Sequence, residues 1–545
     1  MQARSVRQRH SIYIINPAAD APSYHTSESN GRTGGLGWVQ VADLAVVTVA
    51  ALVPDDWRVQ VTDESISDID FETAAEFIAI TGKVSQRSRM YGIAREFRRR
   101  GKTVIIGGSF ATLNADDVRP HADILVTGEL EELAPRLFTD LASGQWQSAY
   151  NGGQADIRLS PLPRWDLYEL GRAQTGALQT SRGCPFDCEF CDVIQYQGRK
   201  QRFKSNEQII AELEQLYGAG CRQIFLVDDN FTVNRRRAQS VLQTISEWNA
   251  GHAGNAVHFL TQASIDVARE PELLALCARA GLRTLFIGIE TTNVESLRET
   301  GKRQNLLLPL EQAIKNILSH GIAVFGGVIA GFDHDGPEIF EKLFDAFQQL
   351  PLPDLSIGCL TAPRSTALHD RLTAEGRLTG EVWDSFAGSP YSTNISPARM
   401  TREQLVAGTT WLSRTAYAPH NFQRRMMNFI ETFGDGGLLP RKSGRQANER
   451  LPLFQQTLAK TMARGPGETA MVREVLRAAS KKTATLPAVV FFLTRYEQFR
   501  YFLDRPADEA TRVDLSRSPT ASFAHGGAER FTAPVRASPD PAPPG

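Results

Sequence analysis

The chain has 545 residues and balances 60 Lys and Arg against 61 Asp and Glu, which gives a net charge of −1. This length exceeds what one hydrophobic core supports, so we expect two or three domains. The neutral balance provides no basic field that would favour nucleic acid. We find neither a secretion signal nor an apolar run of about eighteen residues, so we expect a cytoplasmic protein without a transmembrane helix.

The first 143 residues alternate short apolar runs with helical patterns. Predicted strands cover residues 11–17, 57–62, 77–81, 103–108 and 123–128, and predicted helices cover 42–52, 85–100 and 129–141. A continuous apolar run such as 103–108 is typical of a parallel strand buried on both faces. The alternation predicts an α/β fold with a doubly wound, Rossmann-like parallel sheet over residues 10–143.

Small residues follow three of these strands, at the sheet edge where ligands bind in such folds. They are Gly82, then Gly107, Gly108 and Ser109, then Thr127, Gly128 and Glu129. Glycines let the backbone approach a ligand closely, and helix N-termini favour phosphate. No G-x-G-x-x-G fingerprint is present, so a dinucleotide site is unsupported. Tight turns without a ligand are the alternative interpretation.

A Gly- and Pro-containing linker is expected over 144–173, followed by a strand-then-helix rhythm over 174–375. Predicted strands cover 177–180, 222–230, 257–264, 283–290, 323–331 and 354–361, with helices at 206–219, 272–280 and 308–320. Six such units predict a partial (βα)6 barrel of the TIM type, with chemistry at the carboxyl ends of its strands. Polar residues or a glycine turn stand at those ends: Asp228, Asp229, Gln262, Ser264, Glu290 and Gly331.

Cys184, Cys188 and Cys191 form a C-x3-C-x2-C motif after the first barrel strand. Thiolates suit iron–sulfur clusters, and three of them leave the fourth iron of a cubane open for a small molecule. A zinc site is the first alternative, but the next candidate ligands are the distant Cys221 and His252. A disulfide is the second, and it needs an oxidising compartment. Cys221, Cys277 and Cys359 are scattered, and we expect them to be buried thiols.

The motif, with Arg182-Gly183 before it and Phe190 inside it, resembles that of the radical S-adenosylmethionine (SAM) enzymes. The resemblance implies that the three cysteines hold a [4Fe–4S] cluster. The open iron would chelate SAM, whose reductive cleavage gives a 5′-deoxyadenosyl radical. Residues implied to bind SAM are Phe190, Asp228, Asp229, Gln262, Ser264, Glu290, Ile329 and Gly331. The family often carries a Glu after Gly331, where this chain has His334 and Asp335.

The N-terminal sheet resembles the cobalamin-binding domain that precedes many radical SAM domains. The likeness lies in Ile105-Ile106-Gly107-Gly108 and in Val126-Thr127-Gly128-Glu129. It implies a cobalamin site at Gly82, Gly107, Gly108, Ser109, Thr127, Gly128 and Glu129. The D-x-H-x-x-G signature that supplies a lower His ligand is absent from the chain, and related radical SAM methylases often lack it too.

Three further features have two interpretations each. The basic residues Lys200, Arg202 and Lys204 form either a solvated loop or contacts to phosphate or carboxylate. His334 and His369 are expected to be structural or surface residues rather than catalytic ones. The aromatic stripe over 491–503 is expected to pack in a core, with a substrate-facing or lipid-facing surface as the alternative.

Residues 376–504 carry long helical patterns and resemble the helical extension of a radical SAM subgroup that includes hopanoid C-2 methylases. Residues 505–545 are rich in Pro, Ala, Ser and Gly, and we expect this tail to be disordered.

The resemblance implies a cobalamin-dependent radical SAM enzyme that methylates an unactivated carbon of a hydrophobic small molecule. An electron donor such as flavodoxin or ferredoxin is implied as a partner. One alternative is radical oxidation, cyclisation or rearrangement without methyl transfer, as in anaerobic Mg-porphyrin cyclases. Another is a cobalamin or cluster sensor without turnover. Fold alone does not identify the substrate.

Overall fold

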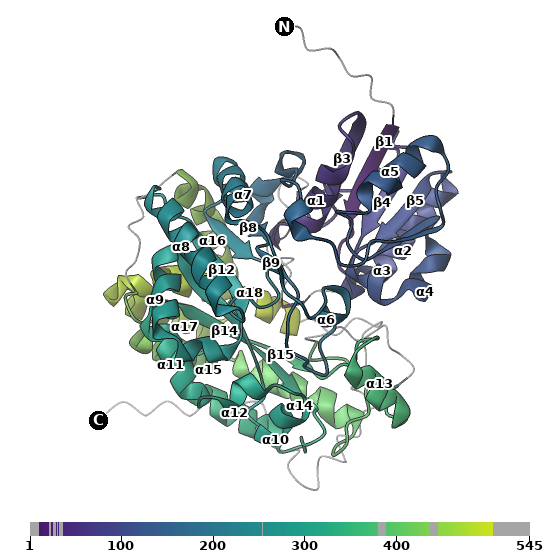
Figure 1. The fold of residues 1–545 in the computed structure, drawn as a ribbon. Coiled ribbons are helices and arrows are strands. Elements are labelled where there is room, and N and C mark those ends of the chain that lie inside the picture. Colours follow the sequence, from purple (N-terminus) through teal and green to yellow (C-terminus); the bar gives the residue numbers. More distant parts are fainter. Residues whose placement is uncertain are drawn as a thin grey trace, which may run out of the picture.

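A computed structural model describes residues 10–20, 23–24, 29, 31, 36–252, 254–379, 389–436 and 445–504. It contains an N-terminal α/β unit, a half-barrel and a set of C-terminal helices (Figure 1). The predicted fold class is confirmed. The tail predicted to be disordered lies outside the described residues. Among the helices that are described, none has the length and apolar character needed to span a membrane.

The first sheet has six parallel strands in the order β3-β1-β4-β5-β6-β7. Their bounds are β1 His10–Asn16, β3 Trp57–Asp63, β4 Phe77–Thr81, β5 Thr103–Gly107, β6 Ile124–Thr127 and β7 Ala149–Asn151. Alternate side chains of β1 enter different cores, because strand side chains point to opposite faces. Ile12 and Ile14 pack in one cluster, and Tyr13 and Ile15 in the other. The order reverses beside β1, and such switch points hold ligands.

Helices cover both faces of this sheet (Figure 1). They are α1 Leu44–Leu52, α2 Arg87–Arg99, α3 Ser109–Leu113, α4 Ala115–Val118 and α5 Ala134–Ser143. The helix predicted from Glu129 begins only at Ala134, because residues 128–133 form a turn held by a hydrogen bond from Glu129 N to Gly153 O (3.0 Å). The linker was also predicted without a strand, but its residues 149–151 pair with β6 as the sixth strand.

The second sheet has seven parallel strands in the order β15-β14-β13-β12-β11-β8-β2. They are β2 Val39–Val41, β8 Ala173–Leu178, β11 Gln223–Leu226, β12 His258–Ala263, β13 Leu282–Glu290, β14 Ala323–Ala330 and β15 Leu355–Cys359. All six predicted barrel strands are present. β2 was not predicted: it lies within the N-terminal unit in sequence but pairs with β8 of the barrel.

Helices follow the barrel strands as predicted. They are α7 Asn206–Gly218, α8 Arg235–Ala250, α9 Pro271–Ala280, α10 Val294–Glu299, α11 Leu310–Ser319 and α12 Ile339–Gln349. Ser205 caps α7 through a capping box with Gln208, which fixes where this helix begins.

Six helices follow the half-barrel in the described part of the chain. They are α13 Ala367–Ala374, α14 Arg402–Ala416, α15 Pro419–Thr432, α16 Arg445–Ala463, α17 Pro466–Lys481 and α18 Leu486–Asp504. Of these, α14 contacts β15 and α18 contacts β14. Phe491 of α18 stacks near Phe325 of β14 at 5.7 Å between ring centroids, so the aromatic stripe packs in a core as predicted.

One arginine of α18 reaches both edge strands of the half-barrel. Arg495 pairs with buried Asp354, which directly precedes β15, and also donates to the Gln40 side chain of β2 (3.4 Å). β15 and β2 are the two ends of the sheet. α18 therefore lies between the edges that the sheet leaves unjoined.

Candidate functional site

The three cysteines lie on one loop whose base is a two-stranded stem. β9 (Ser181–Arg182) pairs with β10 (Arg202–Phe203) in antiparallel fashion, and the loop between them includes the short helix α6 (Val193–Tyr196). Gly183 has φ +96°, and a Cβ there would lie 2.7 Å from Lys200 O, so the loop needs glycine at this turn. The backbone of Cys184 donates to Gly198 O (3.1 Å) and that of Cys191 to Cys188 O (3.0 Å).

The three thiols are free, sit mostly out of solvent and influence one another electrostatically. Burial raises the pKa of each thiol, that of Cys191 to about 12, while the charge of Lys302 lowers all three. Among the described residues, no three His, Cys, Asp or Glu side chains converge closely enough to hold one metal ion. In an iron–sulfur cluster each thiolate binds a different iron, and three free thiols on one loop suit this arrangement.

Asp228 and Asp229 both bind the segment that leads into the cysteine loop. Asp228 is buried and accepts from Thr180 N (2.7 Å), Thr180 Oγ1 (2.5 Å) and Ser181 Oγ (2.6 Å). Asp229 accepts from Gly183 N (2.7 Å), and burial raises its pKa to about 6. Both predicted SAM residues thus contact the start of the cysteine loop. Both oxygens of Asp228 accept hydrogen bonds from Thr180 or Ser181.

Glu290 ends β13 in a strained conformation and points at a buried cation. Its φ is +64°, a region that non-glycine residues rarely adopt, and the pairing of β13 with β14 is irregular there. Lys302 Nζ lies 2.6 Å from Glu290 Oε1 and 5.9 Å from the ring of Phe190. Glu290, Lys302 and the aromatic residue of the cysteine loop are therefore brought together. Lys302 was not predicted.

Ser264 and Gln262 lie at the end of β12, beside the residues that follow β11. Asn230 Nδ2 donates to Ser264 Oγ (2.7 Å), and Ser264 N donates to Asn230 Oδ1 (3.3 Å). The carbonyl of Gln262 accepts from Phe231 N (3.0 Å). These contacts join the carboxyl ends of β11 and β12. The side chain of Gln262 is half-buried.

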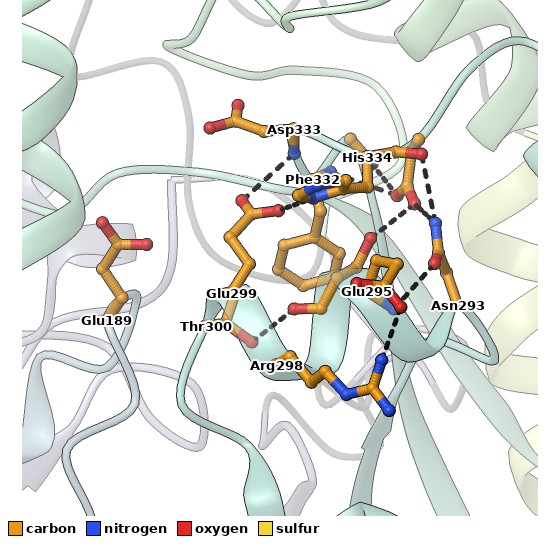
Figure 2. Close-up of polar contacts among 12 residues, drawn as sticks. Glu189, Asn293, Glu295, Arg298, Glu299, Thr300, Phe332, Asp333 and His334 are labelled. Atoms are coloured by element: carbon orange, nitrogen blue, oxygen red, sulfur yellow. Dashed lines mark hydrogen bonds and ion pairs between the residues drawn. The ribbon is translucent and has the colours of Figure 1, made fainter.

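The turn after β14 is tied to α10 (Figure 2). Asp335 accepts from Gly331 N (3.0 Å) and Ser296 Oγ (2.9 Å), while His334 Nδ1 lies 2.6 Å from Glu299 Oε2. His334, expected to be a structural or surface residue, has a structural contact whose acidic partner is 35 residues away in sequence. Ile329, at the end of β14, packs with Phe190 against the cluster around Phe332.

An ionic contact joins the cysteine loop to α13. Arg371 of α13 pairs with Glu189 inside the loop (2.5 Å), with Asp333 (2.6 Å) and with Glu375 (3.2 Å). Sequence reasoning missed this contact, since 182 residues separate Glu189 from Arg371.

A cavity of about 360 Å³ lies where the N-terminal sheet meets the half-barrel, and the space between its walls, including solvent at its mouth, is about 1670 Å³. Six of the predicted cobalamin residues line it: Gly82, Gly107, Gly108, Ser109, Gly128 and Glu129. Thr127 does not, because its hydroxyl donates to Tyr150 O (3.3 Å). Gly108 has φ +95°, and a Cβ there would lie 2.6 Å from Thr81 Oγ1, so the cradle needs glycine. Large apolar walls and a glycine edge fit a bulky planar cofactor.

Barrel residues close the other side of this cavity. Gln179, Arg182, Tyr196, Gln197 and Lys204 line it. Of the predicted basic loop, Lys204 pairs with buried Glu212, and Arg202 pairs with Glu129 (2.6 Å). Both therefore contact carboxylates of the protein itself.

A smaller cavity of about 190 Å³ adjoins the first, and Lys83, Ser109 and Tyr196 line both. Its other walls come from α3, from the residue after Cys191 and from the loop that follows β15. The apolar lining residues are Val84, Phe110, Leu113, Ala362 and Pro363.

The half-barrel and its three-cysteine loop define a radical SAM domain, and residues 178–347 match the Radical SAM superfamily. The predicted resemblance to radical SAM enzymes is confirmed. Residues 366–511 match a domain of unknown function, DUF4070.

Two curated relatives cover much of the chain. An uncharacterized methyltransferase of Synechocystis sp. is 34% identical over 348 residues, which is 63% of this chain and 65% of the relative. The hopanoid C-2 methylase of Rhodopseudomonas palustris is 35% identical over 341 residues, 61% of this chain and 64% of the relative. The chain thus spans just under two thirds of each relative.

The fold is shared with a solved structure, the cobalamin-dependent SAM radical enzyme OxsB with aqua-cobalamin and SAM bound. Its TM-score is 0.58 at 13% identity, covering 91% of this chain and 80% of OxsB. This likeness shows the arrangement of the N-terminal unit and the half-barrel.

Proposed function

We propose that this protein is a cobalamin-dependent radical SAM enzyme that transfers a methyl group to an unactivated carbon. The observation that carries the proposal is the cavity between the two units, which the glycine edge of the sheet and the cysteine loop line together. The names of both curated relatives, a methyltransferase and a methylase, support it. Residues 10–143 would hold cobalamin, and residues 174–375 the cluster and SAM.

When bound, the cluster and SAM supply the radical that removes hydrogen, and cobalamin supplies the methyl group. The chain would hold the cluster with Cys184, Cys188 and Cys191. SAM would lie against Phe190, Asp229, Glu290 and the remaining predicted residues, namely Asp228, Gln262, Ser264, Ile329 and Gly331. The protein's contribution is to orient these groups and to exclude water from the space between them.

The substrate is proposed to occupy the smaller cavity, because it touches both the cobalamin side and the cluster side. Ser109 lies at the sheet edge, and Asp192 directly follows Cys191. The apolar walls favour a hydrophobic metabolite or the hydrophobic part of one. Since all six cysteines are free, we propose a reducing, cytoplasmic setting and a one-electron donor such as flavodoxin or ferredoxin.

The experiment is anaerobic reconstitution with iron, sulfide and hydroxocobalamin, then desalting and an absorption spectrum. About one corrinoid per chain beside the cluster absorption supports the proposal. A cluster without corrinoid would instead favour radical oxidation or cyclisation. Reductant and SAM are then added: a methylase yields deoxyadenosine and S-adenosylhomocysteine with its substrate, whereas the alternative yields only deoxyadenosine.

The matched controls use cysteines of two kinds. Replacing Cys184, Cys188 and Cys191 by Ala removes the cluster and abolishes SAM cleavage. Cys277→Ala alters a buried thiol in α9 and leaves both intact. SAM that stays uncleaved in the wild-type chain under strong reductant would favour the sensor without turnover.

A further inference from the structure

Two arginines on the stem of the cysteine loop share one carboxylate from the N-terminal sheet. Arg182 of β9 and Arg202 of β10 are directly paired residues of the stem. Arg182 Nη1 lies 2.8 Å from Glu129 Oε2, and Arg202 makes a forked contact with both Glu129 oxygens at 2.6 Å. Glu129 therefore contacts both strands at the base of the loop.

This contact is buried and balanced in charge. The side chains of Glu129, Arg182 and Arg202 are 10%, 13% and 13% exposed. Glu131, 3% exposed, supplies the second negative charge at 2.8 Å from Arg182 Nη2. Two cations and two anions thus share one desolvated site, where loss of one partner leaves a buried charge unpaired.

Glu129 extends from a backbone that has little freedom. Gly128 before it has φ +73°, and Glu129 N donates to Gly153 O (3.0 Å). A Cβ on Gly152 would lie 1.7 Å from Glu129 O, so the two turns are in close contact. The carboxylate therefore projects from a rigid point at the end of β6.

Both oxygens of Glu129 already accept hydrogen bonds from within the protein. Oε2 accepts from Arg182, Arg202 and Ala155 N (3.2 Å), and Oε1 accepts from Arg202. A cofactor contact, which the resemblance implied for this residue, would therefore share the carboxylate with these charged donors.

We propose that Glu129 is a positioning residue that locks the cysteine loop to the N-terminal sheet and so sets the separation between the cluster and the cavity beside it. The inference rests on the proposed function in that both units carry a cofactor. Domain interfaces move by default unless strong contacts hold them. Reacting groups displaced by about 1 Å lose about a hundredfold in rate, so such a lock has a direct use.

The first test uses the metal-free chain, so it does not depend on the proposed function. Hydrogen exchange is followed in peptides covering residues 181–203 for wild type, Glu129→Gln and Asp354→Asn. The last variant breaks another buried ion pair, between the barrel and α18. In Glu129→Gln we expect exchange in 181–203 to become about tenfold faster or more, with no such change there in Asp354→Asn. Unchanged exchange in Glu129→Gln overturns the proposal.

Arg202→Lys serves if Glu129→Gln does not fold. Lysine keeps the charge but lacks the forked geometry, so an intermediate increase in exchange is expected. Exchange equal to that of wild type would contradict the proposal, because a single point charge would then suffice.

The second test uses chains reconstituted with iron, sulfide and hydroxocobalamin and then reduced. Dipolar broadening of the cob(II)alamin EPR signal by the reduced cluster reports the separation of the two centres. Glu129→Gln should retain both centres but give a broader distribution of separations. Loss of corrinoid from Glu129→Gln with unchanged loop exchange would make Glu129 a cofactor contact and overturn the proposal. If the reconstituted wild-type chain binds no corrinoid, the proposed function is contradicted. The hydrogen-exchange test then decides alone whether Glu129 is a positioning residue.

Discussion

Lys302 donates a 2.6 Å hydrogen bond to Glu290, and the two side chains are 14% and 7% exposed. Burial alone would lower the pKa of Lys302, but Glu290 and Cys188 raise it overall, so the ammonium stays charged. The same charge lowers the pKa of each thiol in the cysteine loop. The Glu290–Lys302 pair is thus both a support for the strained end of β13 and a source of positive potential beside the thiols.

Lys302→Met is expected to destabilise the protein by about 3–5 kcal/mol, because it leaves Glu290 buried without a partner. Urea denaturation of the metal-free chain measures this. The double variant Glu290→Gln, Lys302→Met should recover part of the lost stability, because the effects of substitutions at contacting residues are not additive. Lys315→Met, which breaks an exposed pair with Glu311, is the control and should cost about 0.5 kcal/mol or less. Equal losses in the two lysine variants would contradict the assigned role of Lys302.

Ala45→Trp is expected to prevent cobalamin retention without unfolding the protein. Ala45 is an exposed residue of α1 that lines the larger cavity, so an indole there takes space from a ligand rather than from the core. Corrinoid per chain after desalting should fall at least about tenfold, while the thermal midpoint stays near that of wild type.

Ala142→Trp on α5 is the matched control for this substitution. Ala142 is also exposed, but it does not line the larger cavity. The control should retain corrinoid, and equal loss in both variants would disprove the location of the site.

Asp333 should stabilise the fold only above acidic pH. Burial would raise its pKa, but hydrogen bonds from Arg377 and Arg371 lower it overall. A carboxyl with a lowered folded-state pKa stabilises above its unfolded pKa of about 3.9 and loses this effect as pH falls through the lowered value. Asp333→Asn should therefore cost about 1 kcal/mol at pH 7 and progressively less below pH ~4. Urea midpoints across pH test this, and a cost that grows on acidification would contradict it.

Arg495→Met should release α18 from the half-barrel. The variant leaves Asp354 buried without its partner, at a cost of about 3–5 kcal/mol. Limited proteolysis should then cut within residues 486–504 faster than in wild type. Arg477→Met on the neighbouring helix α17, which breaks an exposed pair with Glu474, is the control and should have little effect. Similar cleavage of the two variants would argue against Arg495 as the main anchor.

The sequence predicted those features that depend on neighbouring residues. Runs such as 103–107 are apolar throughout because both faces of the strand are buried, and the cysteine spacing is a property of one loop. The predicted start of α7 at residue 206 is confirmed, and the Ser205 cap that fixes it is local. These signals are contained within a few residues, so one chain suffices to find them.

The missed features depend on residues that are far apart in sequence. β2 has three residues and joins β8 more than 130 positions later, so no local pattern identifies its partner. A carboxylate contact was one of the two interpretations of Arg202, and the structure shows such a contact. No local pattern indicated that Glu129 was the partner. The predicted start of α5 at Glu129 was wrong for the same reason, because Gly153 holds that turn.

The position of α18 between β2 and β15 has a consequence for how the chain is made. During synthesis the edge strand β2 leaves the ribosome early, β15 much later, and the helix that contacts both comes last. Ser389 O and the Tyr417 hydroxyl bond the backbone of β15 and emerge before α18, but β2 lacks its contact with Arg495 until residues near 495 emerge. Exposed strand edges favour aggregation. A chain stalled or shortened before α18 is therefore the species that chaperones would have to shield.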